Sequence, residues 1–156
     1  MSRVFIVGSG GHAKSLAALV SEDSEVVFVT LEEEHIGGVS TLKESEFLSK
    51  NPGDFFLVNG IGAINDTFHR LSVQASFEQK GFSFSSILAS SSEVVRTATL
   101  GNGVQLLSNS FIGHGASVED NVVIGTGSIV EHDCEIGAGS FIGPGAVLCG
   151  GVKIGP

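Results

Sequence analysis

The sequence predicts an α/β domain followed by a parallel β-helix, on three observations. Near the start, an apolar run is followed by a glycine-rich turn and a helical pattern, as at the opening of a βαβ unit. Over residues 94–154 an aliphatic anchor recurs at every sixth position. That period fits neither an α-helix nor an alternating strand and is typical of a β-helix. Near residue 88 charged residues become sparse, so we expect two domains, residues 1–87 and 88–156.

Composition excludes several classes of function. The 156-residue chain has a net charge of −9, which makes nucleic acid a poor partner. No run of about 18 apolar residues is present, so we expect no membrane span. Met1 is followed almost at once by the first predicted strand, so we expect no secretory signal and a cytoplasmic location. Cys134 and Cys149 are expected to be free, buried thiols.

In the first domain, strands are predicted at residues 4–7, 26–29, 55–58 and 82–87. Helices are predicted directly after the glycine turn, at 41–49 with Thr41 as a possible cap, and at 65–79. Residues 89–92 are expected to link the two domains. Ligands of parallel α/β sheets bind at the carboxyl ends of the strands. The residues expected to bind a substrate there are Gly8, Ser9, Gly10, Gly11, His12, Thr30 and Gly60.

The glycine turn fits the phosphate-binding pattern G-x-G-x-x-G/A, with Gly8, Gly10 and Ala13 in the patterned places. A dinucleotide site would also need an acidic residue at the end of the second strand, where Thr30 stands. We therefore expect phosphate binding without an NAD site. Two alternatives stay open: His12 either faces the ligand or begins the helix, and the turn at 60–62 either contacts the ligand or only joins strand to helix.

Together the two halves resemble the sialic acid O-acetyltransferase and bacterial sugar acyltransferase family. The residues that carry the resemblance are 7–12 (VGSGGH), 129–137 (IVEHDCEIG) and 144–152 (PGAVLCGGV). The resemblance implies a Rossmann-like sugar-nucleotide-binding domain and a left-handed β-helix. It further implies an enzyme that transfers an acetyl group from acetyl-CoA to an amine or hydroxyl of a nucleotide-linked sugar or a sialic acid. A homotrimer without a metal cofactor is also implied.

The resemblance also assigns roles within the repeats. Three hexads would make one coil of 18 residues, which places Arg96, His114, His132 and Gly150 on one corner. By resemblance, His132 is the general base, Asp133 orients its imidazole, and the backbone N–H of Gly150 binds the oxyanion. Glu131 precedes this pair and is counted with the catalytic residues.

Two alternatives stay open for His114: a structural or interface role, or a role accessory to His132. Two charged imidazoles about 5 Å apart repel by about 3 kcal/mol at an effective dielectric constant of 20. A charged His114 would therefore disfavour a proton on His132. A zinc site is disfavoured, because the repeats hold two histidines and β-helical zinc sites use three.

The sequence departs from the family in three places. Phe141 stands where the family often has a second histidine, and Thr30-Leu31 replaces the acidic pair that commonly holds the nucleotide. The chain stops at Pro156, where relatives continue, so we expect an incomplete, truncated β-helix. The alternative function is a non-catalytic sugar-nucleotide-binding or trimeric scaffold module.

Overall fold

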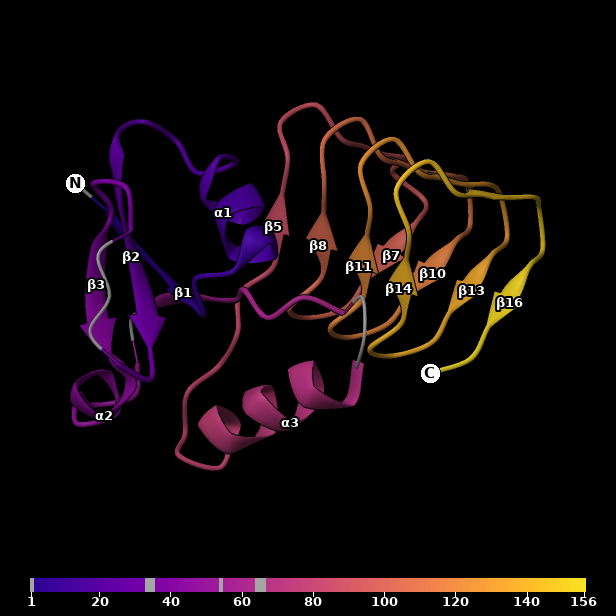
Figure 1. Ribbon diagram of the computed structural model, residues 1–156. Coiled ribbons are helices and arrows are strands. Elements are labelled where there is room, and N and C mark those ends of the chain that lie inside the picture. The colour runs from indigo at the N-terminus through magenta and orange to yellow at the C-terminus, as the bar shows by residue number, and fades with distance from the viewer. Residues whose placement is uncertain (1, 33–35, 54, 64–66) are drawn as a thin grey trace. The chain divides into compact units, whose positions relative to one another are not determined.

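The computed structural model describes residues 2–32, 36–53, 55–63 and 67–156, and divides into two compact units, Met1–Ser85 and Ser86–Pro156. In the first unit, four strands form a parallel sheet in the order β3-β2-β1-β4. The strands are β1 (Ser2–Val7), β2 (Ser24–Thr30), β3 (Ser40–Lys43) and β4 (Phe56–Asn59). The helices are α1 (Gly11–Ala17), α2 (Glu44–Phe47) and α3 (Thr67–Glu78) (Figure 1). This confirms the predicted parallel α/β sheet. Residues 65 and 66, the predicted start of α3, lie outside the described residues.

Successive side chains along each strand of this sheet point to opposite faces. Those on one face form an apolar cluster with the helices that follow β3 and β4: Phe5, Val7, Val27, Val29 and Leu57 with Phe47 of α2 and Phe77 of α3. The Phe47 ring centroid lies 5.0 Å from that of Phe5 and 5.1 Å from that of Phe82. Such aromatic contacts fix α2 and α3 against the sheet.

The first three residues of the helix predicted at 41–49 belong to a strand, so that prediction is wrong for its first part. Thr41 and Leu42 pair with Phe28 and Val29 of β2, and Leu42 packs against the apolar cluster. The sheet satisfies backbone groups that the first turn of a helix would leave open. The helix α2 begins only at Glu44, with Lys43 and not Thr41 at its N-cap.

The strand predicted at 82–87 is also absent from this part of the described chain. Phe82 and Phe84 are buried and Ser83 is exposed, as in an extended segment. One backbone bond joins the segment to the sheet, from the Ser85 N–H to the Leu57 oxygen at 2.7 Å, which is too few for a ladder. Residues 87–88 instead form β5, the first strand of the second unit, and residues 89–92 form a corner rather than a link.

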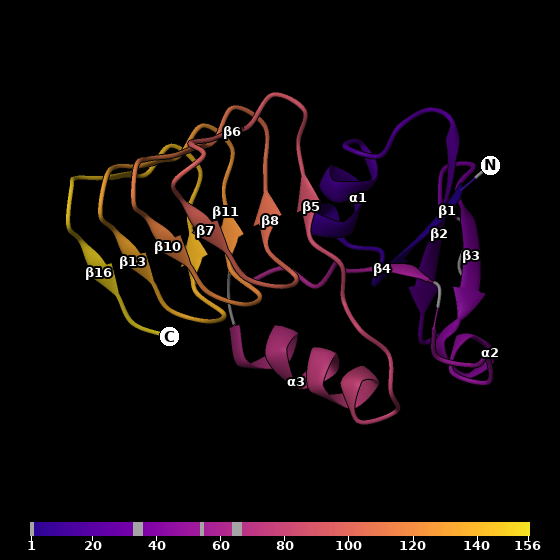
Figure 2. The ribbon, with the colours of Figure 1, turned by 180° about the vertical axis from the view of Figure 1, so that it is seen from behind.

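The second unit is a β-helix of two-residue strands in three parallel sheets, ordered β14-β11-β8-β5, β15-β12-β9-β6 and β16-β13-β10-β7 (Figures 1 and 2). Paired residues are 18 apart, as in Phe111↔Ile129 and Ile129↔Val147, so each coil has the predicted length. The strands are β5 (Ile87–Leu88), β6 (Glu93–Val94), β7 (Thr99–Leu100), β8 (Gln105–Leu106), β9 (Phe111–Ile112), β10 (Ser117–Val118), β11 (Val123–Ile124), β12 (Ile129–Val130), β13 (Glu135–Ile136), β14 (Phe141–Ile142), β15 (Val147–Leu148) and β16 (Lys153–Ile154).

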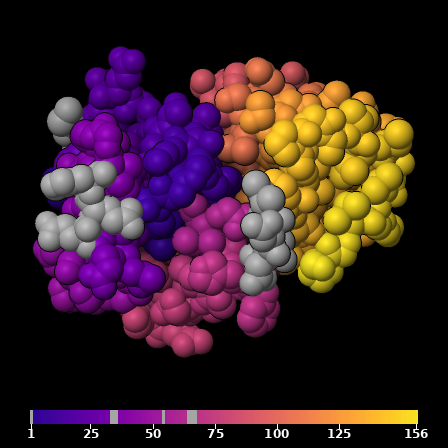
Figure 3. Space-filling model, viewed as in Figure 1, coloured from indigo at the N-terminus to yellow at the C-terminus, as the bar shows by residue number. Residues whose placement is uncertain are grey.

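The predicted anchors form the core of the β-helix. Leu106, Ile112, Ile124 and Val130 have no exposed surface, and they pack with small residues such as Cys134 in one cluster. In the space-filling view the coils, orange to yellow, pack directly on one another (Figure 3). Both cysteines are free as expected, but Cys149 is exposed, because it lies just before a corner rather than inside the prism.

Two glycines that follow anchors test how tightly the coils stack. A Cβ at Gly113 would lie 2.8 Å from the backbone of Glu131 and His132, whereas a Cβ at Gly143 would meet only the Phe141 ring at 4.0 Å. We expect Gly113→Ala to lower the free energy of unfolding by about 1–3 kcal/mol, since backbone must move. The matched Gly143→Ala should change it by less than about 0.5 kcal/mol. Urea denaturation measures both, and equal effects would contradict the stacking argument.

Candidate functional site

One corner of the β-helix stacks the residues that the sequence singled out. Its successive layers are Arg96–Thr97, His114–Gly115, His132–Asp133 and Gly150–Gly151. The backbone joins these layers directly, because the Asp133 N–H donates to the His114 oxygen and the Gly151 N–H to the His132 oxygen, both at 2.9 Å. His132 and Gly150 therefore lie in adjacent layers of one column.

The His132 imidazole is held by its own neighbour in the chain. Nδ1 of His132 lies 2.9 Å from Oδ2 of Asp133. A carboxylate can only accept hydrogen bonds, so Nδ1 carries the proton and donates it. In the neutral imidazole this leaves Nε2 with a free lone pair. Both side chains are exposed, at 62% and 66%, so a substrate can reach this nitrogen.

Gly150 forms the surface against which Nε2 lies. A Cβ at this position would overlap Cε1 and Nε2 of the His132 ring, so the absence of a side chain makes room for the imidazole. The Gly150 amide N–H donates to no atom of the described chain. A proton acceptor and an open backbone donor therefore stand in neighbouring layers, as a general base and an oxyanion donor must.

Asp133 occupies a backbone position that other coils give to glycine. Its φ is 59°, and the residues above and below it in the column, Gly115 and Gly151, have φ of 68° and 74°. Aspartate tolerates this left-handed region better than most residues do. A Cβ at Gly115 would lie 2.7 Å from Oδ1 of Asp133, so this glycine leaves space for the carboxylate.

His114 and Glu131 are placed differently from the His132–Asp133 pair. Nδ1 of His114 lies 2.8 Å from the Thr97 hydroxyl, and Gly115 stands where His132 has its acid. Glu131 is half-buried, and its carboxylate makes no hydrogen bond to the described residues. No contact joins either residue to the imidazole of His132 in this part of the chain, so their roles stay predictions.

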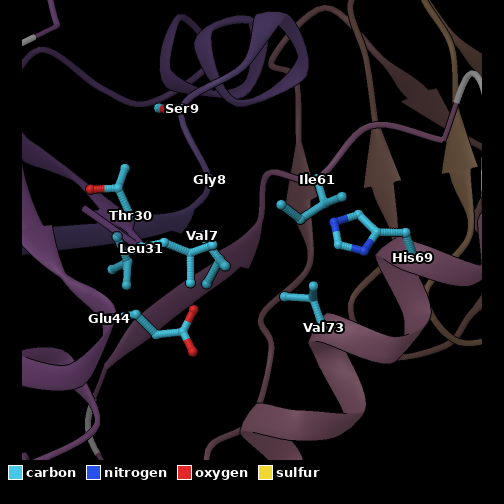
Figure 4. A pocket seen from close by; sticks show the side chains of 10 residues that line it. Val7, Gly8, Ser9, Thr30, Leu31, Glu44, Ile61, His69 and Val73 are labelled. Carbon is cyan, nitrogen blue, oxygen red and sulfur yellow. The ribbon is translucent and has the colours of Figure 1, made fainter. Parts of the chain in front are cut away.

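In the first unit, a cavity of ≈ 290 Å³ lies at the carboxyl ends of β1 and β2 (Figure 4). Three of the predicted substrate-binding residues line it, Gly8, Ser9 and Thr30. Gly8 leaves the sheet with φ of 91° while its N–H donates to the Val29 oxygen at 2.7 Å. The Thr30 hydroxyl donates to the Glu32 oxygen at 2.6 Å, so it is engaged with the backbone.

The other predicted substrate-binding residues lie outside the cavity lining, namely Gly10, Gly11, His12 and Gly60. A Cβ at Gly10 or Gly11 would meet nothing within 4 Å, so a ligand has room beside this turn. Gly60 differs, because a Cβ there would lie 2.6 Å from both Ile6 Cγ2 and the Val7 oxygen. Packing alone explains this glycine, which favours the joining role of the turn at 60–62.

Sequence reasoning missed two polar residues of the cavity, Glu44 and His69. Glu44 begins α2 directly after β3, and His69 lies in the first turn of α3 after β4. The buried Asn59 orients that second connection, accepting from the Ile61 N–H at 3.0 Å and donating to the Arg70 oxygen at 3.1 Å. Burial lowers the pKa of the neighbouring Arg70 guanidinium to about 10.

The described residues contain no cluster of three or more side chains that could hold a metal ion. Within the same residues, no helix is both long and apolar enough to cross a membrane.

The repeats of the second unit match a known family of repeat sequences. Residues 97–132 match the family model "Bacterial transferase hexapeptide (six repeats)", and the match ends on His132. These repeats thus match the hexapeptide repeats of bacterial transferases, as the resemblance implied. A comparison with curated proteins finds no match.

Particular solved structures share this fold over nearly the whole chain. The acetyltransferase domain of PglB from Neisseria gonorrhoeae is 24% identical, with 99% of this chain and 77% of that chain covered and a TM-score of 0.85. PerB from Caulobacter crescentus, solved with CoA and GDP-perosamine, is 26% identical, with 99% and 84% covered and a TM-score of 0.81. WeeI from Acinetobacter baumannii is 17% identical, with 97% and 94% covered and a TM-score of 0.64.

The fit between Gly150 and the imidazole can be tested without any substrate. We expect Gly150→Ala to displace the His132 ring, because the new Cβ would occupy its place. In NMR spectra the Cε1–H resonance of His132, assigned with a His132→Asn variant, should move while that of His114 stays. Gly155→Ala, whose Cβ would meet nothing within 4 Å, serves as the control. An unmoved His132 resonance in Gly150→Ala would contradict the proposed geometry.

Proposed function

We propose that this protein transfers an acetyl group from acetyl-CoA to an amine or hydroxyl of a nucleotide-linked sugar. The observation that carries the proposal is the His132–Asp133 pair, whose free Nε2 lies against Gly150. A scaffold has no need of an oriented base beside an open backbone donor. Structures of similar fold support the choice of substrates, since PerB binds CoA and GDP-perosamine and the PglB domain binds acetyl coenzyme A.

In the proposed reaction, Asp133 keeps the proton on Nδ1, and Nε2 of His132 takes a proton from the acceptor amine or hydroxyl. The freed electron pair attacks the thioester carbonyl carbon, and the Gly150 N–H donates to the oxygen as it becomes negative. Collapse of the tetrahedral intermediate breaks the carbon–sulfur bond. The imidazolium then returns its proton to the departing CoA thiolate, so the base is regenerated.

The glycine turn and the cavity of the first unit are proposed to bind the sugar nucleotide. Backbone N–H groups of the turn at residues 8–12 would meet the phosphates, which explains phosphate binding by a chain of net charge −9. The open space at Gly10 and Gly11 admits this close approach. A cytoplasmic location, as expected from the sequence, is part of this proposal.

A homotrimer is also proposed, because a row of apolar side chains runs along the outer face of one sheet of the β-helix. Phe111, Ile129 and Val147 occupy paired outward positions on β9, β12 and β15. Val147 is 60% exposed, and the other two are only half-buried. An apolar strip of partly exposed side chains is typical of a surface that another copy covers.

The alternative function is a non-catalytic sugar-nucleotide-binding or scaffold module. Phe141 favours it, because it is half-buried in β14 where the family often has a second histidine. Acetyl transfer by the unaltered protein would distinguish the enzyme from the non-catalytic module.

We expect His132→Asn to lower kcat for acetyl transfer by about 10²–10⁴-fold, the range of a lost general base. His114→Asn, the same change one coil earlier, should cost less than about 10-fold, since His114 has no carboxylate beside it. Release of CoA should be followed by chromatography, because the exposed Cys149 would consume thiol reagents. Equal losses in the two variants would contradict the assignment of the base. Absence of turnover with any nucleotide-linked amino sugar would favour the scaffold function.

A further inference from the structure

The cavity of the first unit has apolar walls and, besides the hydroxyl groups of Ser9 and Thr30, two ionisable side chains, Glu44 and His69. Val7 and Val29 come from the sheet, and Ile61 and Val73 from the connection after β4 and from α3. Leu31, at its edge, is 78% exposed although it is large and apolar. Apolar surfaces of this kind suit a flat heteroaromatic ring, and a few polar groups then decide which ring binds.

Glu44 is the first of these polar groups. It is half-buried, and its carboxylate points into the cavity from the start of α2 (Figure 4). Within the described residues, this carboxylate makes neither a hydrogen bond nor an ion pair. A partly buried carboxylate without a partner is unfavourable, and a ligand with N–H groups would stabilise it. The nearby Glu46, in contrast, is exposed and does not line the cavity.

His69 is the second polar group, and it approaches from the side of α3, across the cavity from Glu44 (Figure 4). The imidazole always offers at least one N–H donor. The ligand therefore meets an acceptor on one side and a donor on the other.

Few nucleobases complement that arrangement. A carboxylate is an acceptor with two oxygens, and guanine presents two adjacent donors, N1–H and N2–H₂. Uracil offers a single N3–H flanked by two carbonyl oxygens, which repel a carboxylate. In adenine and cytosine the amino group is next to an unprotonated ring nitrogen. Guanine also carries the acceptors O6 and N7 on another edge, where a histidine N–H can donate.

We propose that this cavity binds the base of the sugar nucleotide and that Glu44, with His69 opposite, selects guanine. The inference rests on the proposed function in taking the ligand to be a nucleotide. Glu44 would supply the carboxylate that Thr30 does not provide at the end of β2.

The test is calorimetric titration of the whole chain, without acetyl-CoA, with GDP, IDP, UDP, CDP and ADP. We expect GDP to bind at least about 10-fold more tightly than the others, including IDP, which lacks the 2-amino group. Glu44→Gln should weaken GDP binding by about 10- to 100-fold and make GDP and IDP nearly equal. Glu46→Gln, the same change on the same helix but outside the cavity, should leave every affinity within about 2-fold. Thermal unfolding verifies that each variant is folded.

Preference for UDP, CDP or ADP in the unaltered protein would overturn the choice of guanine. Equal weakening of all nucleotides in Glu44→Gln, or no weakening, would overturn the role of Glu44. Both results are independent of acetyl transfer. If CoA is released with another nucleotide-linked sugar, the proposed function stands while this inference fails. If GDP binds as expected but no acetyl group is transferred, the choice of guanine stands while the proposed acetyltransferase function fails.

Discussion

Parallel backbone pairing at a separation of 18 residues is the constraint on which the second unit depends. Each strand contributes only two residues, so no strand is long enough to hold its register alone. Pairing with the coils on either side, together with an aliphatic anchor in every hexad, fixes the register instead. A slip of one residue would turn the anchors outward. The same constraint brings residues that are distant in sequence, such as His132 and Gly150, into neighbouring layers of one corner.

Within that constraint, small differences between coils separate a reactive position from an inert one. His114 and His132 occupy equivalent places, yet the residue that follows is glycine in one coil and aspartate in the other. Of these two histidines, only His132 has a carboxylate at its Nδ1 and a glycine in the next layer facing its Nε2. His114 pairs with a threonine hydroxyl, which can donate or accept and so does not decide the tautomer. The backbone of this corner therefore repeats from coil to coil, whereas the side chains around each imidazole differ.

The β-helix was largely predictable from the sequence, because its periodicity is the direct consequence of one buried anchor in each hexad. The first unit was less predictable, since tertiary contacts override local preference there. Thr41 and Leu42 follow a helical pattern but join the sheet, and Phe82 and Phe84 alternate like a strand without forming a ladder. The first of these errors concealed Glu44. The parallel strand at residues 40–43 places Glu44 at its carboxyl end, where ligands of such sheets bind.

The left-handed backbone of Asp133 has a consequence for how such proteins should be engineered. A residue with a side chain in this region carries a cost of about 1 kcal/mol or more, which glycine avoids. Six other corners of this β-helix place glycine there, at positions 103, 115, 127, 139, 145 and 151. A procedure that averages the repeats into one consensus coil would therefore replace Asp133 with glycine and report a gain in stability. The averaged protein would retain every coil and lose the one carboxylate that orients its imidazole.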